Sequence, residues 1–213
     1  MTKRAKFAIG VLTFAVLTGV AWKNSVAISG LATPGSCKVV TTDAVLQLSI
    51  SDTQNYVNEV ISAEKDLAAE SISCSLWPNT SESSTDLNMI GLTSAAQFMW
   101  DNVDQRFGFI PFGGFAPGGV DSGHMKDSAH YKGKAIDFFF KPYKNKNKVA
   151  KGWTLANWAV ANAERLGIAN VIYQDRIWSR TSSFKGWQVF VPSYGDPKNA
   201  TIRHLDHVHI DVN

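Results

Sequence analysis

The chain has only two cysteines among its 213 residues, Cys37 and Cys74. Two thiols cannot build the CxxC-paired zinc sites found in many small domains, so any metal here must be held by histidine and carboxylate. In an exported protein, paired thiols are expected to oxidise. We therefore predict a Cys37–Cys74 disulfide, whose closed loop would stabilise the fold by roughly 3–4 kcal/mol. Two buried free thiols are the alternative.

The sequence also lacks an internal repeat and a glycine-rich phosphate-binding loop, and its basic excess is confined to the N-terminus. Four of the 21 basic residues precede residue 27, which leaves 17 against 18 acidic residues in the remainder. Nucleic-acid binding needs a basic patch in the folded part of a protein, so we predict no nucleic-acid partner. The lysines between Lys141 and Lys151 are interpreted as a solvated loop, with contact to an anionic polymer as the alternative.

The N-terminus has the features of a secretory leader. Lys3, Arg4 and Lys6 precede an apolar run, 7–22, and small residues follow at 25–27. This pattern predicts a signal peptide over 1–27 and a protein that is secreted or held in the cell envelope. The alternative is an uncleaved leader, which would be the chain's only link to a membrane.

After the leader, we predict a small N-terminal segment over 28–90. It has a short strand within 39–50 and then a helix that starts at a capping box, Ser51 to Gln54. Apolar residues at helical spacing carry that helix to Leu67. The polar stretch 79–88 reads as a linker to a second domain over 91–213.

The second domain alternates helical and strand patterns. Helices are expected from Thr93 or Ser94 and from Thr154, the latter ending at Gly167. Strands are expected over 135–140, 168–173, 187–191 and 207–212. This order predicts an α+β fold with a largely antiparallel sheet flanked by helices, and we expect a monomer.

Five histidines lie in two clusters, and the stretch "DHVHID" at 206–211 contains two of them. His207 and His209 are two residues apart, so on a strand they share one face. In "SAHYKGKAID" at 128–137, Gly133 supplies a turn that would bring His130 towards Asp137. Catalytic zinc takes three protein ligands, and His130, Asp137 and a C-terminal histidine would supply them. Otherwise His130 is a surface loop residue and Asp137 a strand-end cap.

These two stretches resemble the patterns of the zinc D-Ala-D-Ala carboxypeptidases, which group with lysostaphin-type and hedgehog-type metal domains. The chain is also similar to exported actinobacterial domains of this kind. The resemblance implies a Zn²⁺ ion held by His130, Asp137 and His209 in a metal cleft on the sheet. It implies that Asp206 or His207 acts on the metal-bound water. Asp206 has the family's spacing and is the favoured base, whereas His207 shares a strand face with His209 and could stabilise the oxyanion.

In one place the chain departs from these relatives, because Phe115 and Ala116 stand where an arginine often binds a substrate carboxylate. Arg106 is the nearest substitute, and Arg106 and Ser128 are the candidate substrate-binding residues. The sequence thus predicts an exported zinc hydrolase of peptide bonds, with peptidoglycan stem or crossbridge peptides as substrate. The alternatives are a metal-containing binding module of the cell envelope that lacks activity, and a structural domain without metal.

Overall fold

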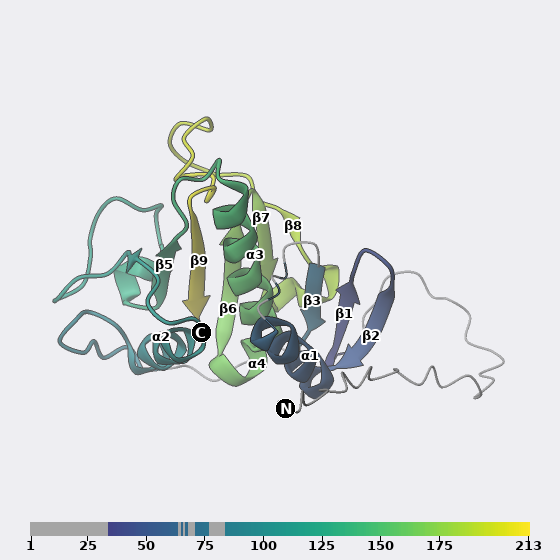
Figure 1. Cartoon of the computed structure of the whole chain (residues 1–213). Helices are drawn as coiled ribbons and strands as arrows, with labels where there is room; N and C mark the ends of the chain where they lie inside the picture. Colours follow the sequence, from purple (N-terminus) through teal and green to yellow (C-terminus); the bar gives the residue numbers. More distant parts are fainter. Residues whose placement is uncertain (1–33, 64, 66, 68–70, 77–83) are drawn as a thin grey trace, which may run out of the picture.

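The computed structural model describes residues 34–63, 65, 67, 71–76 and 84–213, and the predicted leader lies outside them. The described chain forms two antiparallel sheets with helices, which confirms the predicted α+β fold (Figure 1). The smaller sheet has the order β2-β1-β3 and the larger one β4-β5-β9-β6-β7-β8. The strands are β1 (Ser36–Val40), β2 (Val45–Ser49), β3 (Ser71–Ser75), β4 (Phe112–Gly113), β5 (Ala135–Phe139), β6 (Ile168–Tyr173), β7 (Arg176–Ser179), β8 (Gln188–Val189) and β9 (His207–Val212).

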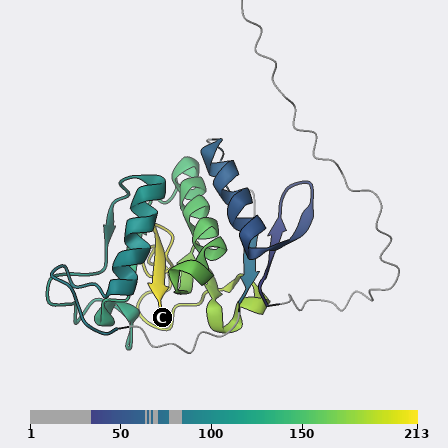
Figure 2. The same ribbon diagram turned by 90° about the horizontal axis from the view of Figure 1, so that it is seen from below.

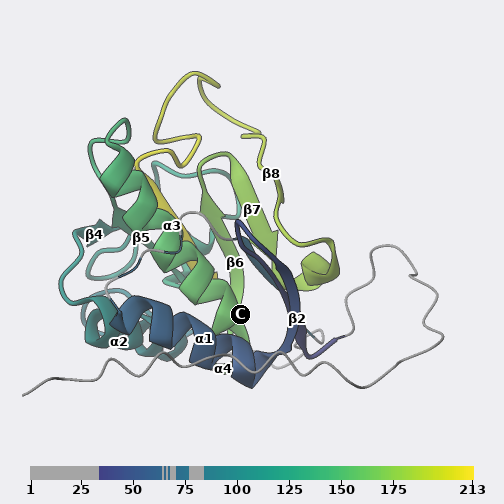
Figure 3. The same ribbon diagram turned by 45° about the vertical axis from the view of Figure 1, so that its right-hand side comes forward.

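The longer helices lie together on one side of the larger sheet. Figures 2 and 3 show α2, α3 and α1 side by side, with β9 and β6 behind this layer. The helices are α1 (Ile50–Ser62), α2 (Ser94–Phe107), α3 (Lys146–Ala161) and α4 (Ala163–Leu166), with short 3₁₀ helices η1 (Ala129–Lys132) and η2 (Arg180–Lys185). Within the described residues, no helix has the length and hydropathy to cross a bilayer.

One hydrophobic core joins the N-terminal segment to the rest of the chain. Buried residues from the small sheet belong to the same cluster as those of α3, β6, β7 and β9. Polar contacts reinforce the junction, because Thr154 Oγ1 accepts a bond from the backbone N–H of Leu67 at 2.9 Å and Asn157 Oδ1 accepts one from Ile72 at 3.1 Å. The segment therefore packs against α3.

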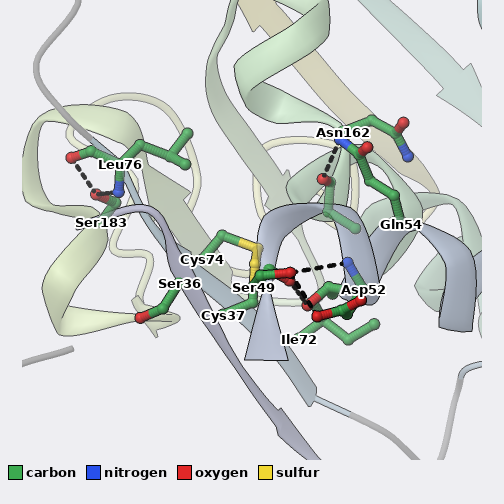
Figure 4. The surroundings of a disulfide bond; sticks show 12 residues. Ser36, Cys37, Ser49, Asp52, Gln54, Ile72, Cys74, Leu76, Asn162 and Ser183 are labelled. Carbon is green, nitrogen blue, oxygen red and sulfur yellow. Dashed lines mark hydrogen bonds between the residues drawn. A yellow bond between two sulfur atoms is a disulfide. The ribbon is translucent and has the colours of Figure 1, made fainter. Parts of the chain in front are cut away.

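The predicted disulfide is confirmed. Cys37 and Cys74 face each other across the β1–β3 pair, with an S–S distance of 2.03 Å and Cα atoms 3.9 Å apart. The bond lies close to the start of α1, where Ser49 and Asp52 are hydrogen-bonded (Figure 4). It thus ties the first strand to the last strand of the small sheet.

Two predicted helix starts were wrong. Helix α1 is capped by Ser49, whose Oγ accepts a bond from the Asp52 N–H, so the cap lies two residues before Ser51. The helix also ends at Ser62, short of the predicted end at Leu67. Helix α3 begins at Lys146 with Asn145 as its cap, and Thr154 lies inside it. Most of the lysine run predicted as a loop therefore forms the exposed first turns of α3.

The strands of the larger sheet follow the sequence pattern more closely. β6 and β9 span the predicted residues, and β5 stops at Phe139, one residue early. The strand expected over 187–191 is only two residues long, Gln188–Val189, because it pairs at the sheet edge with β7 alone.

Candidate metal centre

The two central strands of the larger sheet carry the polar residues of the candidate site. Asp137 on β5 lies directly opposite His209 on β9 in the antiparallel register. Strand alternation puts His207 on the same face as His209, whereas Val208 and Ile210 point to the core and have no exposed surface. One face of the strand pair is thus apolar and covered by helices, and the other presents a carboxylate and imidazoles.

The 3₁₀ helix η1 brings His130 to this face. Ser128 caps it, with its Oγ accepting a bond from the His130 N–H at 3.3 Å, and Gly133 ends it in the left-handed conformation at φ 61°. A Cβ on Gly133 would lie 2.5 Å from the carbonyl oxygen of Gly91, so the position accepts no side chain. The turn predicted at Gly133 therefore exists, and it directs the buried His130 towards β5.

Three side-chain atoms converge. His130 Nε2 lies 3.2 Å from Asp137 Oδ1 and 3.0 Å from His209 Nδ1, and His209 Nδ1 lies 3.0 Å from Asp137 Oδ1. All three side chains are buried or nearly so. The residues that the sequence analysis selected as ligands are thus brought into one triangle of donor atoms.

The far side of each imidazole in this triangle is held by an oxygen. His130 Nδ1 donates to the carbonyl of Gly114 at 2.8 Å, so Nε2 is the ring nitrogen that faces the triangle. His209 Nε2 donates to Asp211 Oδ2 at 3.1 Å, and Asn170 donates to the same carboxylate. Outer partners of this kind fix the tautomer and orientation of metal-binding histidines.

Gly114 and Asp211 were not identified from the sequence. A Cβ on Gly114 would lie 2.3 Å from Cε1 of His130, so only glycine lets the backbone approach the ring. Strand alternation puts Asp211 on the same face as His207 and His209, so Asp211 could have been identified from the sequence. Gly114 gave no such signal, because its role depends on how a loop packs against η1.

Asp206 and His207, the two candidate bases, are hydrogen-bonded to each other. His207 Nδ1 lies 2.8 Å from Asp206 Oδ1, and His207 Nε2 lies 3.6 Å from Asp137 Oδ1 on the side of the triangle. Burial opposes ionisation of Asp206, but the hydrogen bond from His207 and its charge lower the pKa of Asp206 to about 2. Thr201 and Lys141 also contact the carboxylate. His207 therefore lies between the Asp206 carboxylate and the triangle formed by His130, Asp137 and His209.

His124 joins the cluster from the loop before η1. Its ring stacks on His130 with 4.0 Å between centroids, and Tyr131 Oη binds both its backbone N–H and its carbonyl. His124, His130 and Asp137 each offer a donor atom, and these atoms lie within 4.8 Å of one another, a grouping that could hold a metal ion. Burial, with the neighbouring His130, lowers the pKa of His124 to about 4, so its imidazole is neutral.

His204 completes the set of histidines from the turn before β9. It has a left-handed backbone, φ 53°, and its ring lies 4.7 Å from that of His207 and 4.8 Å from Phe190. Burial first, and then His209 and His207, lower its pKa to about 2. His204 thus forms a neutral wall beside His207.

The charges of Asp137 and His209 support each other. Burial opposes ionisation of Asp137, yet hydrogen bonds from His130 and His209 keep its pKa well below the ordinary value. Burial would likewise lower the pKa of His209, but Asp137 and Asp211 raise it to about 10. Without a metal ion, the imidazolium of His209 therefore donates one N–H to Asp137 and the other to Asp211.

All five histidines line one cavity of about 640 Å³, together with Ser128, Lys132 and Lys134. Arg106 and Asp206 are not among the described lining residues, and no arginine is. Arg106 instead donates to the carbonyl of Asn58 and to Ser62 Oγ on α1.

Trp178 and Trp187 do not line this cavity. Each donates its indole N–H to a carbonyl of β3, Trp178 to Cys74 at 3.2 Å and Trp187 to Ile72 at 2.8 Å. Trp178 has no exposed surface. The tryptophans therefore help to attach the small sheet.

Comparisons with curated proteins and with solved structures gave no significant match. A family model described as VldE, C-terminal domain, matches residues 90–205. The matched region includes His124, His130 and Asp137 and ends just before His207 and His209. Because the match covers more than half of the 213 residues, the chain belongs to the VldE C-terminal domain family.

Proposed function

We propose that the protein is an exported zinc-dependent hydrolase of peptide bonds, with peptidoglycan stem or crossbridge peptides as its substrate class. The observation that carries this proposal is the triangle of His130 Nε2, Asp137 Oδ1 and His209 Nδ1, with edges of 3.0–3.2 Å. It lies at a cavity large enough for a peptide segment.

The donor set fits zinc. Ligand atoms about 2.0–2.1 Å from one tetrahedral ion lie about 3.3 Å apart, close to the observed edges. Two imidazoles and one carboxylate form a common set at catalytic zinc, and their outer partners, Gly114 and Asp211, leave the correct nitrogens free. His124 is the alternative third imidazole, because its donor atom also lies near His130 and Asp137.

The chemistry divides between metal and protein. Zinc, when bound, polarises a carbonyl and lowers the pKa of a coordinated water towards about 7. His207 would accept the proton of the attacking water through Nε2, since its Nδ1 is engaged by Asp206. Asp206 would orient the ring and stabilise its charged form, in the manner of a carboxylate–histidine pair. We therefore propose His207 as the base and Asp206 as the residue that positions it.

The substrate class rests on location and on the lining of the cavity. The predicted leader indicates export, and the Cys37–Cys74 bond is typical of an oxidising compartment. Lys132 and Lys134 line the cavity and supply the positive charge that a free carboxylate of a wall peptide requires. They would take the role for which Arg106 was the candidate.

A binding module that holds a metal but does not catalyse remains the second candidate. It is favoured by the lining of the cavity, in which no arginine occurs among the described residues. Under this alternative the metal would shape the cavity and bind a wall peptide through its carboxylate. The same metal site would then serve recognition alone.

The test is metal analysis of the purified protein followed by incubation with purified peptidoglycan. We expect about one zinc per chain and release of new amino or carboxyl termini, detected by mass spectrometry of the soluble fragments. Loss of release on chelation and recovery with added zinc would support the hydrolase. A zinc-loaded protein that binds peptidoglycan but releases nothing would instead favour the binding module.

A further inference from the structure

A second cavity of about 460 Å³ lies on the opposite side of the larger sheet from the histidines. Its walls come from α1, α2 and α4, which lie next to one another (Figures 1 and 3), and its floor includes Trp158 of α3. None of its residues lines the histidine cavity. The two cavities lie on opposite sides of β9, because Val208 and Ile210 point towards the helices and the histidines of this strand point the other way.

This helical cavity contains two arginines, Arg106 and Arg165. Arg165 donates to the side-chain oxygens of Asn102 at 2.7 Å and Asn162 at 3.2 Å. Arg106 donates only to Asn58 O and Ser62 Oγ. No carboxylate forms an ion pair with either guanidinium among the described residues, although Arg180 and Arg203 each have one.

Part of the hydrogen-bonding capacity of this cavity is unused. Nε of Arg106 is buried and has no hydrogen-bond partner within the described chain. The exposed amide side chains of Asn55, Asn58 and Gln105 also line the cavity, and they have no hydrogen bond to another residue that the structure describes. Buried donors normally find partners, so the unpaired Nε of Arg106 marks unused hydrogen-bonding capacity in this cavity, a feature that Arg180 Nε and His204 Nδ1 share elsewhere in the described chain.

We propose that this cavity binds a sugar that carries an anionic group, a carboxylate or a phosphate. Guanidinium groups recognise both anions through paired charge-assisted hydrogen bonds. Neutral amides match hydroxyl groups, since each amide both donates and accepts. A cavity lined by arginines and amides therefore matches an acidic saccharide better than a peptide or an apolar ligand.

The proposal stands apart from hydrolysis. The helical cavity shares no residue with the metal centre, and the two open on different faces. Binding there would hold the protein on an acidic glycan while the other face remains accessible. A protein without metal should therefore bind the sugar equally well, so failure of one proposal does not imply failure of the other.

The test is calorimetric titration of the purified protein, in chelator, with four probes. N-acetylmuramic acid and N-acetylglucosamine 6-phosphate carry the two anions, N-acetylglucosamine is the neutral parent sugar, and inorganic phosphate is the bare anion. We expect an acidic sugar to bind at least about tenfold more tightly than the neutral one, the effect of a charge-assisted hydrogen bond. Which acidic sugar binds identifies the anion.

Variants assign the binding to this cavity. Arg165→Gln should weaken binding about tenfold, whereas Arg176→Gln, the same change at an exposed position of β7, should not. Gln105→Glu adds a negative charge at an exposed position, so it should abolish binding while the fold persists. Equal binding of neutral and acidic sugars, binding of phosphate as tight as that of either acidic sugar, or unchanged affinity in both cavity variants would overturn the proposal.

Discussion

His209 is bound on both sides, by Asp137 at Nδ1 and by Asp211 at Nε2. His124, by contrast, is positioned through its backbone and by stacking on His130. If the ion is held by His130, Asp137 and His209, we expect His209→Ala to abolish stoichiometric zinc binding and His124→Ala to retain it. Metal analysis after dialysis measures both. If the His124 variant lost zinc and the His209 variant kept it, His124 would be the metal ligand and His209 would not.

The geometry of the Asp206–His207 pair leads to a prediction about rate. His207 lines the cavity and Asp206 lies behind it. His207→Ala should reduce peptide hydrolysis by about 10²–10⁴-fold, the usual loss for a general base, with zinc still bound. Asp206→Asn should also slow the reaction, because the ring loses its orienting carboxylate. Full activity in the His207 variant with none in Asp206→Ala would make Asp206 the base.

Zinc binding should release a proton. The raised pKa of His209, about 10, means that the metal-free side chain is protonated at pH 7. A proton on a ligand nitrogen competes with the metal, so affinity should fall as pH falls, by about tenfold per unit for each proton displaced. Calorimetric titration with zinc in two buffers of different ionisation enthalpy counts the protons. Identical heats in both buffers would contradict the prediction.

At the scale of elements, the end of η1 determines whether His130 reaches β5. Gly133 and Gly167 have nearly the same left-handed backbone, φ 61° and 66°, but a Cβ would meet the Gly91 carbonyl only at Gly133. Gly167→Ala should therefore cost about 1 kcal/mol of unfolding free energy for its backbone conformation alone. Gly133→Ala should cost clearly more and also weaken zinc binding. Denaturant titration compares them, and equal losses would mean that the Gly91 contact relaxes freely.

Strands with a regular hydrophobic pattern were predicted more accurately than the start of helix α3, which has no such pattern. β9 alternates Val208, Ile210 and Val212 with polar residues, and β6 is rich in β-branched residues, so both strands could be delimited from the sequence. The start of α3 was missed because its first turns are rich in lysine and show no apolar face. Thr154 was mistaken for the N-cap, but it lies inside the helix and its hydroxyl accepts a hydrogen bond from the backbone of Leu67, far away in the sequence. Tertiary contacts of this kind are not visible in local sequence.

In the candidate site too, residues on regular elements were predicted and residues on loops were not. Strand alternation and the turn at Gly133 predicted that His130 and Asp137 lie near a C-terminal histidine, and the resemblance to the zinc carboxypeptidases singled out His209. The three side chains do lie together. The inclusion of His124 and His204, and the carbonyl of Gly114, depend on loops whose path no periodicity specifies. Arg106 was selected for its charge alone, and the packing of α2 against α1 directs it to the other cavity.

At the scale of the whole molecule, the small sheet is part of the common core and is not an independent domain. The Cys37–Cys74 bond closes a loop with a sequence separation of 37 residues, which corresponds to about 3–4 kcal/mol in the chain-entropy estimate. Replacing both cysteines by serine should lower the unfolding free energy by about that amount, in a single cooperative transition.

The cooperativity is the informative part of this experiment. Trp178 and Trp187 donate to carbonyls of β3, so unfolding of the small sheet would expose the indoles that cover it. Tryptophan fluorescence and far-ultraviolet circular dichroism should therefore give the same midpoint in denaturant, with and without the disulfide. An earlier fluorescence transition in the serine variant would show that the small sheet detaches first. The disulfide, which joins β1 to β3 within the small sheet, would then be needed to keep that sheet folded against the shared core.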